Sequence, residues 1–485
     1  MENSTAAPAN KEPTPVKLKF WEKVGYGVGD TASNLYFQTF LYFTMVFYTD
    51  VFGLSAAVVG TMLFVSRLFD AITDPIIGAL ADRANTRWGK FRPFVFFFAV
   101  PMAVMGVLAF TTPDMFDDTG KLVYAYITYN GLMVFYTLVN VPYSSLMAVI
   151  TPNSMERVEL SSFRFVGTFV GGLIIQFGTL YLVAGLGQGN DELGWQLTMG
   201  VFGLLAVGLL FITFVSSKER IAPPQHREKT TLHLKDLFTN VAWVMIAAAT
   251  VFQLIFIVVR SSAIAYYFRY YIGEQPVHLL GMTFEPTMTT LNSLFLGLGS
   301  AATILGVLLT KKMARVFDKK LTYVGCMAIS SVLSLLFFYL PPESIVPIFL
   351  TNLVVSFVWG PVSVLQWAMY TDAADYGEWK NHRRATGLLM AISLFAIKLG
   401  LAIGGGVTGW ALSYYGFEAN VEQTAEATQG ILTLMSFIPA FFGVLCVACM
   451  VVYPLNNKTM NDIEEKLKER RAAEGTDRPN QDTLL

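Results

Sequence analysis

Apolar segments of about 20 residues recur from one end of the chain to the other, with short polar stretches between them. Such a run is long enough for a helix to cross the hydrocarbon core of a bilayer. The pattern therefore predicts an all-α integral membrane protein with twelve membrane-spanning helices. The expected spans are 24–48, 56–80, 93–111, 122–150, 158–184, 195–215, 241–271, 288–309, 321–340, 345–371, 388–414 and 430–453.

A polar, basic stretch in the middle of the chain divides these spans into two sets of six. Residues 216–236 have the sequence SSKERIAPPQHREKTTLHLKD, the longest such loop in the chain. Two sets of six helices predict two halves with a binding site between them near the membrane midplane. We expect an N-terminal tail at 1–22, a first half at 23–215, a central loop at 216–240, a second half at 241–455 and a C-terminal tail at 456–485.

Basic residues gather in alternate loops, and this distribution predicts the orientation of the chain. Most of the 34 Lys and Arg residues fall in the tails, the central loop and every second loop, whereas the other loops hold mainly acidic residues. Cytoplasmic loops of membrane proteins carry the excess of Lys and Arg. Both termini and the central loop are therefore expected in the cytoplasm. We expect no cleaved signal peptide, because the polar start lacks an apolar core segment.

Composition agrees with a membrane protein and narrows its class. Hydrophobic residues make up 54% of the chain and charged residues 14%, with a mean hydropathy of +0.51, whereas soluble proteins contain about 25% charged residues. Cys326, Cys446 and Cys449 all fall in apolar spans, which predicts core residues and no disulfide or metal site. The sequence contains no HExxH, GxSxG or P-loop motif, so neither a membrane enzyme nor a nucleotide-driven pump is expected.

The second expected span carries charges where a membrane helix should have none. Asp70 and Asp74 lie four residues apart, so both carboxylates leave one helix face about one turn apart, with the Thr73 hydroxyl on the same face. Carboxylates in hydrocarbon are costly unless they line a wet cavity or hold a cation. An ion pair with Arg67 is the alternative, but one arginine cannot neutralise two acids. The pattern therefore favours a cation site.

Several motifs in a fixed order carry a resemblance to a known family. They are GYGVGD at 25–30, FYTDVFGL at 47–54, FDAITDP at 69–75, NTRWGKFRP at 85–93, YTLVNVPYSSL at 136–146, TDAADYGEWKNHRRATG at 371–387 and AIKLGLAIGG at 396–405. Together they resemble the glycoside–pentoside–hexuronide:cation symporters of the major facilitator superfamily, over residues from about 20 to 455. WGKFRP and DYGEW are the specific motifs among them, and the glycine pairs are not.

The resemblance implies the major facilitator fold and a secondary transporter of the inner membrane without a cofactor. Its partners would be the lipid bilayer, a monovalent cation and a glycoside, pentoside or hexuronide taken into the cell, with no nucleic acid. It would function as a monomer. The alternative is a symporter of the same fold for a non-sugar substrate such as a lysophospholipid, which would need an apolar lateral path and fewer polar groups.

Carried over to this chain, the family's cation site falls on Asp70, Thr73, Asp74 and Thr137. Sodium prefers several oxygen ligands, which these side chains supply. A carboxylate pair can instead share a proton, because two like charges close together do not both ionise easily. Sodium and proton coupling therefore both remain open, and the two hydroxyls favour sodium slightly.

The resemblance also implies a sugar site between the halves. The residues expected to bind the substrate are Asn34, Tyr136, Asn140, Ser144, Arg164, Arg260, Gln366 and Lys398. The melibiose branch of the family has acids at the positions of Asn34 and Asn140, so this chain keeps amides beside its cations.

Arg164, Lys398 and Arg260 offer charge that a carboxylate on the sugar would match. A structural alternative to substrate binding stays open, in which Lys398 pairs with Asp70 or Asp74 when the cation is absent and Arg164 bonds backbone carbonyls; for Lys398 the two roles are compatible. Tyr266 and Tyr267 are candidates for stacking on a sugar ring, although packing is the commoner role of such aromatics.

Charged residues at the cytoplasmic ends of the spans predict a gate. The sequence GALADRANTR resembles the loop signature of the superfamily, in which a small residue lets helices close and charges latch the loop. The gating residues expected here are Gly78, Asp82, Arg83 and Arg87 in the first half and Asp372 and Asp375 in the second. Gly78 is the expected point of close helix approach. The role of Asp30 is left open.

Overall fold

The computed structural model describes residues 17–84, 86–113, 115–151, 153–220, 239–279, 282–381 and 386–476. Nearly all of them are helical. The elements are α1 Phe20–Tyr42, α2 Thr44–Val46, the π-helix η1 Phe47–Val51, α3 Ala56–Arg83, α4 Arg92–Phe97, α5 Ala99–Ala109, α6 Asp118–Ile150, α7 Ser154–Gly187, α8 Asp191–Ser216, α10 Val241–Tyr266, the π-helix η2 Tyr267–Ile272, β1 Val277–Leu279, β2 Met282–Phe284, α11 Met288–Phe317, α12 Lys319–Tyr339, α13 Ile345–Asn381, α14 Thr386–Tyr414, α15 Ala425–Met435, α16 Phe437–Val452 and α17 Asn457–Thr476.

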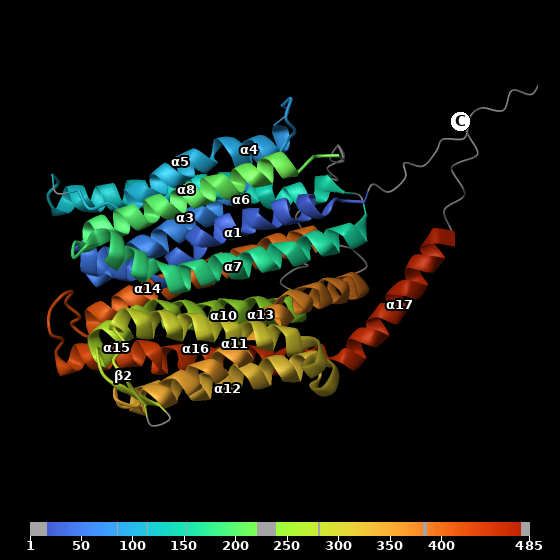
Figure 1. Cartoon of the computed structure of the whole chain (residues 1–485). Helices are drawn as coiled ribbons and strands as arrows, with labels where there is room; N and C mark the ends of the chain where they lie inside the picture. Colours follow the sequence, from blue (N-terminus) through green and yellow to red (C-terminus); the bar gives the residue numbers. More distant parts are fainter. Residues whose placement is uncertain are drawn as a thin grey trace, which may run out of the picture.

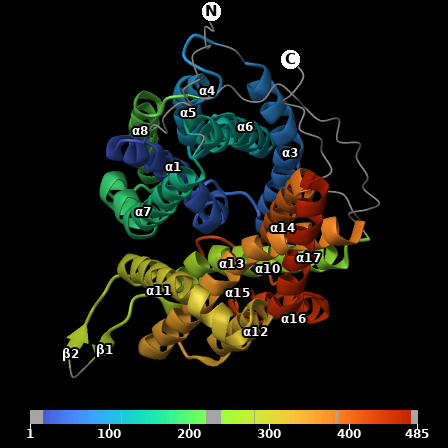
Figure 2. The same ribbon diagram turned by 90° about the vertical axis from the view of Figure 1, so that its right-hand side faces the viewer.

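The membrane-spanning helices form two bundles that lie side by side. In Figure 1 the helices from α1 to α8 form the upper bundle and those from α10 to α16 the lower one, and α17 extends away from one end. The view along the helices in Figure 2 separates the same two groups. The bundles meet mainly where α3 packs against α14 and α7 packs against α11. The interface between them is therefore built from helices of both halves of the sequence.

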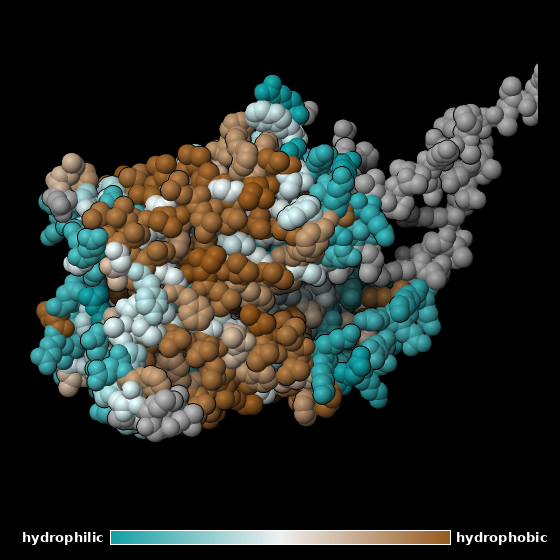
Figure 3. Space-filling model, viewed as in Figure 1, coloured by the Kyte–Doolittle hydropathy of each residue, from teal (hydrophilic) through white to brown (hydrophobic). Residues whose placement is uncertain are grey.

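Eleven helical segments among the described residues are long and apolar enough to cross a membrane. Apolar side chains form a broad band across the face of the bundle seen in Figure 3, with polar residues at both ends. The expected span at 24–48 forms α1 to η1 but is not among the eleven, and it carries buried polar residues such as Asp30, Ser33 and Asn34. α1 begins and α17 ends at the same end of the bundle (Figure 1), as an even number of crossings requires.

Prolines explain why two expected spans are each split into two helices. The third span divides into α4 and α5, and the last into α15 and α16. Pro101 and Pro439 are each the third residue of the second piece. A proline lacks the N–H for an intrahelical bond and its ring clashes with the carbonyl four residues earlier, so the helix breaks just before it.

Glycines set the closest approach between the halves. A Cβ on Gly409 of α14 would lie 2.3 Å from the Ala56 carbonyl oxygen and 2.6 Å from the Gly60 Cα, both in α3. No side chain fits there, so the two helices pack backbone to backbone. The helices α3 and α14 run antiparallel, and further along them the same close packing places the polar face of α3 against α14.

Candidate cation and substrate site

The two acids of the second span meet a lysine from the other half of the chain. Asp70 and Asp74 lie on α3, and Lys398 reaches them from α14. The Lys398 Nζ donates to Asp70 Oδ2 at 2.8 Å and to the Asp70 carbonyl oxygen at 3.2 Å, and it forms an ion pair with Asp74. The alternative in which Lys398 pairs with the acids is therefore the arrangement that the structure has.

Hydroxyl groups complete the surroundings of the acid pair. Thr137 of α6 donates to Asp70 Oδ1 at 2.9 Å, while Thr73 donates to the Asp70 carbonyl oxygen at 3.1 Å. The Oδ1 atom of Asp74 is buried without a hydrogen-bond partner among the described residues. Arg67 lies over the Phe40 ring, 5.5 Å from its centroid. All four residues expected at the cation site thus lie together, and an ammonium group already neutralises part of their charge.

This arrangement has a clear chemical capacity. Two carboxylates one turn apart repel each other when both are ionised, so the pair attracts any cation that reaches it. The carboxylates and the two threonine hydroxyls are hard oxygen ligands of the kind that sodium prefers. Lys398 contacts the same carboxylates, so a bound cation and the ammonium compete for them.

Arg164 has a carboxylate partner on α1. Its Nε and terminal nitrogen donate to Asp30 Oδ1 at 3.3 and 3.0 Å, and Thr168 donates to the other carboxylate oxygen of Asp30. The guanidinium also lies 5.1 Å from the centroid of the Tyr143 ring. The role of Asp30, which the sequence left open, is therefore to pair with Arg164.

Two amides expected at the substrate site, Asn34 and Asn140, each donate a hydrogen bond to their own helix. Asn34 donates to the Asp30 carbonyl oxygen at 2.9 Å, and Asn140 donates to the Tyr136 carbonyl oxygen at 3.0 Å. The Tyr136 ring packs edge-on against Phe40, and Ser144 is exposed. Each amide keeps its side-chain oxygen and one N–H for another partner.

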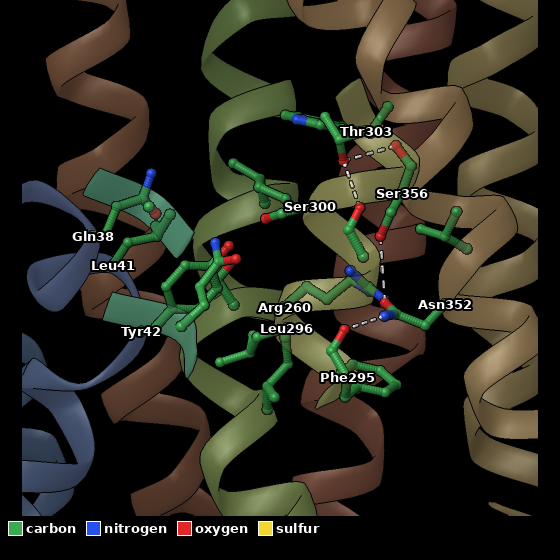
Figure 4. A pocket seen from close by; sticks show the side chains of 18 of the residues that line it. Gln38, Leu41, Tyr42, Arg260, Phe295, Leu296, Ser300, Thr303, Asn352 and Ser356 are labelled. Atoms are coloured by element: carbon green, nitrogen blue, oxygen red, sulfur yellow. Dashed lines mark hydrogen bonds between the residues drawn. The ribbon is translucent and has the colours of Figure 1, made fainter. Parts of the chain in front are cut away.

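A cavity of about 200 Å³ lies between the two halves. It is lined by residues of α1, α7, α10, α11 and α13, and Figure 4 shows the side chains that surround it. Of the residues expected to bind substrate, Arg260 is the one that lines this cavity. Its terminal nitrogen donates to Asn352 Oδ1 at 2.5 Å. Asn352 is a polar lining residue that sequence analysis missed.

Gln366 lies elsewhere than expected. Its side-chain oxygen accepts a hydrogen bond of 2.9 Å from Gln253 within the second half, and Tyr323 donates to the same Gln253. Gln366 is 4% exposed and does not line the cavity. The expectation that it contacts substrate is therefore not supported by this arrangement. The physical reason is that its side-chain oxygen is bonded to Gln253 inside the second bundle.

A set of polar contacts that sequence analysis missed joins the halves at one end, which the charge distribution predicts to be the outer one. We call Thr49, Asp50, Tyr266, Arg269, Tyr270 and Asn420 the outer cluster. Tyr270 donates to Asp50 Oδ2, and Arg269 lies 3.4 Å from the same oxygen. Thr49 and Tyr266 share a hydrogen bond of 2.7 Å, and Asn420 donates to the Asp50 carbonyl oxygen at 2.6 Å.

The outer cluster lies at two π-helices in matching places, η1 after the first span and η2 at the end of α10. Tyr266 and Tyr267 are fully buried here, so both rings pack inside the protein; the Tyr266 hydroxyl bonds Thr49, whereas the Tyr267 hydroxyl has no partner among the described residues. The sequence feature that could have indicated this cluster is a charged residue inside each of two aromatic segments, FYTDVF and YYFRYY. The bundle is therefore closed at this end.

Comparison with known proteins decides the family. A family model described as MFS/sugar transport protein matches residues 25–457. The chain belongs to this family. It is 37% identical to the putative glycoside/cation symporter YagG of Escherichia coli (strain K12) over 461 residues, which cover 95% of this chain and 97% of the relative. It is 35% identical to the isoprimeverose transporter of Lactiplantibacillus pentosus over 483 residues, 97% of each chain.

The fold comparison agrees. A solved bacterial homologue of the human drug peptide transporters PepT1 and PepT2 superposes with a TM-score of 0.66 at 13% identity, covering 90% of this chain and 98% of that one. The major facilitator fold and the resemblance to the glycoside–pentoside–hexuronide:cation symporters are thus confirmed. The protein is a multi-pass transporter of the plasma membrane and not an enzyme.

In this symporter, two of the charges expected at the gate contact groups of their own half. Asp372 pairs with Lys319, both in the second half, and Arg87 stacks over Trp88 at 4.6 Å. Arg83 is exposed, and the side chain of Asp82 lies outside the described residues. Asp375 is half-buried on the same helix as Asp372. The gating role of these residues stays a prediction.

Gly78 is not a point of close approach here. A Cβ at this position would meet Val141 at 3.6 Å, an ordinary contact. The close approach of α3 lies at Gly60 instead. Gly78 stays a predicted gating residue, whose closer packing would belong to a state in which the inner end is shut.

The WGKFRP motif has a structural role that sequence analysis did not assign. The Glu219 carboxylate, just after α8, accepts hydrogen bonds from the backbone N–H groups of Lys90, Phe91 and Arg92 at 2.7, 2.8 and 2.9 Å. Gly89 has φ of +111°, and a Cβ there would lie 2.6 Å from that carboxylate. The motif therefore ties the loop before α4 to the end of α8, and its glycine makes the room.

Proposed function

We propose that this chain is a cation-coupled symporter that carries a glycoside or a related sugar into the cell, with Asp70, Thr73, Asp74 and Thr137 as its cation site. The single observation that carries the proposal is the bridge from Lys398 of the second half to both carboxylates of the first. The helices α3 and α14, of 28 and 29 residues, hold the three groups together where the two halves meet. The family and the names of the relatives support the sugar as cargo.

The bridge explains how a cation and a sugar become coupled. When no cation is bound, the Lys398 ammonium compensates the acids and holds α14 against α3. A cation that enters releases Lys398, because both need the same carboxylate oxygens. Because α3 and α14 belong to different halves, this exchange changes a contact between the two halves, which move relative to each other during transport. Thermodynamic linkage then makes the effect reciprocal. If the cation raises the affinity for the sugar by some factor, the sugar raises the affinity for the cation by the same factor.

The sugar would lie between the halves, on the inner side of the outer cluster. Arg164, Asn34 and Asn140 offer donors and acceptors from the first half, and Arg260 offers donors from the second. Amides and guanidinium groups suit the hydroxyls of a sugar, which both donate and accept. One chain supplies every group in this proposal, so we expect the protein to work as a monomer. Both termini and the central loop would face the cytoplasm.

Uptake in a bacterial strain without glycoside carriers tests the proposal. Labelled β-xylosides, α- and β-galactosides and glucuronides are offered with and without sodium, at two pH values and with a protonophore as a further condition. Concentrative uptake of at least one glycoside that depends on sodium or on the proton gradient is the expected result. Flat uptake across the panel would contradict the proposed function. A response to sodium alone identifies sodium as the coupling ion, and a response to the protonophore alone identifies the proton.

A further inference from the structure

The cavity in Figure 4 has one charged side chain among its lining residues, and no acid of that lining balances it. Arg260 is 4% exposed, and the other side chains of the wall are amides, hydroxyls and aromatic or aliphatic groups. The guanidinium donates to Asn352 and lies 5.4 Å from the centroid of the Phe337 ring. A buried charge without a counter-charge is costly, and a ligand of opposite charge would remove that cost.

The other two cations expected to meet the substrate differ from Arg260 in this respect. Arg164 is paired with Asp30, and Lys398 is paired with Asp70 and Asp74. Their charge is already balanced inside the protein. An anionic group on a substrate would have to displace a carboxylate from either of them, whereas at Arg260 it would meet a guanidinium that, among the described residues, contacts an amide oxygen and an aromatic ring but no carboxylate.

Unpartnered polar atoms point to the same place. The Nε of Arg260, the side-chain oxygen of Gln176 and that of Gln38 are all buried without a hydrogen-bond partner among the described residues, and all three residues line the cavity. Gln176 is 3% exposed. Buried donors and acceptors are nearly always satisfied in folded proteins, so these atoms indicate a missing partner. That partner must accept from a guanidinium and also donate hydrogen bonds, as an anionic group next to hydroxyls does.

We infer that this cavity is a subsite for an anionic group, a carboxylate or a sulfonate, carried by the transported glycoside. Arg260 holds the anion, Asn352 orients the guanidinium, and Gln38 and Gln176 bond the neighbouring hydroxyls. Gly299 leaves room for Asn352, because a Cβ there would lie 3.0 Å from the Asn352 amide nitrogen. The inference rests on the proposed function and specifies the substrate class that the site selects.

Three β-glycosides that differ only at C5 of the sugar ring test it. They are the 4-nitrophenyl β-D-xyloside, glucoside and glucuronide, with a hydrogen, a hydroxymethyl and a carboxylate group at that carbon. Affinity is measured as inhibition of labelled uptake and by calorimetry on the purified full-length protein. Arg260→Gln removes the charge and keeps amide donors, and Asn352→Asp supplies a carboxylate that neutralises Arg260 in place. Lys311→Gln removes one exposed positive charge of the second half as the matched control.

The wild type should bind the glucuronide more tightly than the glucoside and the xyloside. Arg260→Gln and Asn352→Asp should each weaken glucuronide binding by about 10- to 100-fold, the usual range for a lost charge-assisted hydrogen bond, and change the two neutral glycosides by less than about threefold. Lys311→Gln should change none of them.

The inference is overturned if the wild type prefers the neutral glycosides or if Arg260→Gln weakens all three equally. Cation-stimulated uptake of a neutral glycoside would then still stand and keep the proposed function intact. If the wild type takes up none of the glycosides with either cation, the proposed function itself fails, and the inference falls with it.

Discussion

Removing one hydroxyl from the outer cluster should shift the balance between the two ends of the transporter. The Tyr270 hydroxyl donates to Asp50 Oδ2 and accepts from the Asn420 backbone N–H at 3.0 Å, so Tyr270→Phe removes two contacts at this end of the bundle. Asp50 keeps Thr49 at 2.7 Å and Arg269 at 3.4 Å, so the closed end is weakened but not abolished.

A hydrogen bond to a charged group is worth about 1.5–3 kcal/mol. If these contacts exist only when the outer end is closed, their loss raises the population of the outward-open state by about 10- to 150-fold relative to the closed one. A cysteine at Ser300, which lines the cavity between the halves, reports this opening. It is labelled in intact cells with a membrane-impermeant maleimide, against a background without that cysteine.

Tyr271→Phe is the matched control, because the neighbouring Tyr271 hydroxyl donates to the Leu340 carbonyl oxygen at 2.9 Å within the second half. We expect faster labelling of the Ser300→Cys protein with Tyr270→Phe and no change with Tyr271→Phe. Equal labelling rates with and without Tyr270→Phe would refute the gating role of the outer cluster. Equal acceleration by both substitutions would refute it as well.

Three further predictions concern packing, the loop tie and the bridge. Gly306→Ala should destabilise the purified protein by about 1–3 kcal/mol, because its Cβ would lie 1.9 Å from the Phe357 carbonyl oxygen, whereas Gly325→Ala, which meets nothing within 4 Å, should leave the thermal midpoint nearly unchanged. Glu219→Gln should cost about 1–3 kcal/mol in the same assay, because the amide nitrogen that replaces one carboxylate oxygen cannot accept, so at least one of the three backbone N–H groups loses its acceptor. Lys398→Gln should raise the affinity for the coupling cation by about 10-fold or more in calorimetry, because it removes the competing ammonium; a weaker affinity would contradict the competition.

The sequence predicted most of the fold because membrane spans and charged loops leave strong one-dimensional signals. The acid pair was equally visible, since Asp70 and Asp74 interrupt an apolar helix at a spacing of one turn. The partnership with Lys398 was left as one of two alternatives. Residues 328 positions apart carry no local sign of contact, and only the packing of α14 on α3 brings them together.

The sequence did not predict which way helices face within the bundle. Gln366 was expected at the sugar site, but α13 is apolar on most sides, so no amphipathic stripe marks the side that faces the cavity. The pairing of Arg164 with Asp30 was missed for the same reason, because two different helices supply it. Gly78 illustrates a third limit: a glycine permits close packing, but the conformational state decides where that packing occurs.

Reciprocal binding measurements on the purified protein test the central claim most directly. Calorimetry gives the affinity for a transported glycoside with and without the coupling cation, and the affinity for the cation with and without that glycoside. We predict that each ligand tightens the other by the same factor in the wild type and that this factor falls to about one in Asp74→Asn, while some sugar binding persists. If Asp74→Asn keeps the wild-type factor, the acid pair bridged by Lys398 does not couple the cation to the sugar.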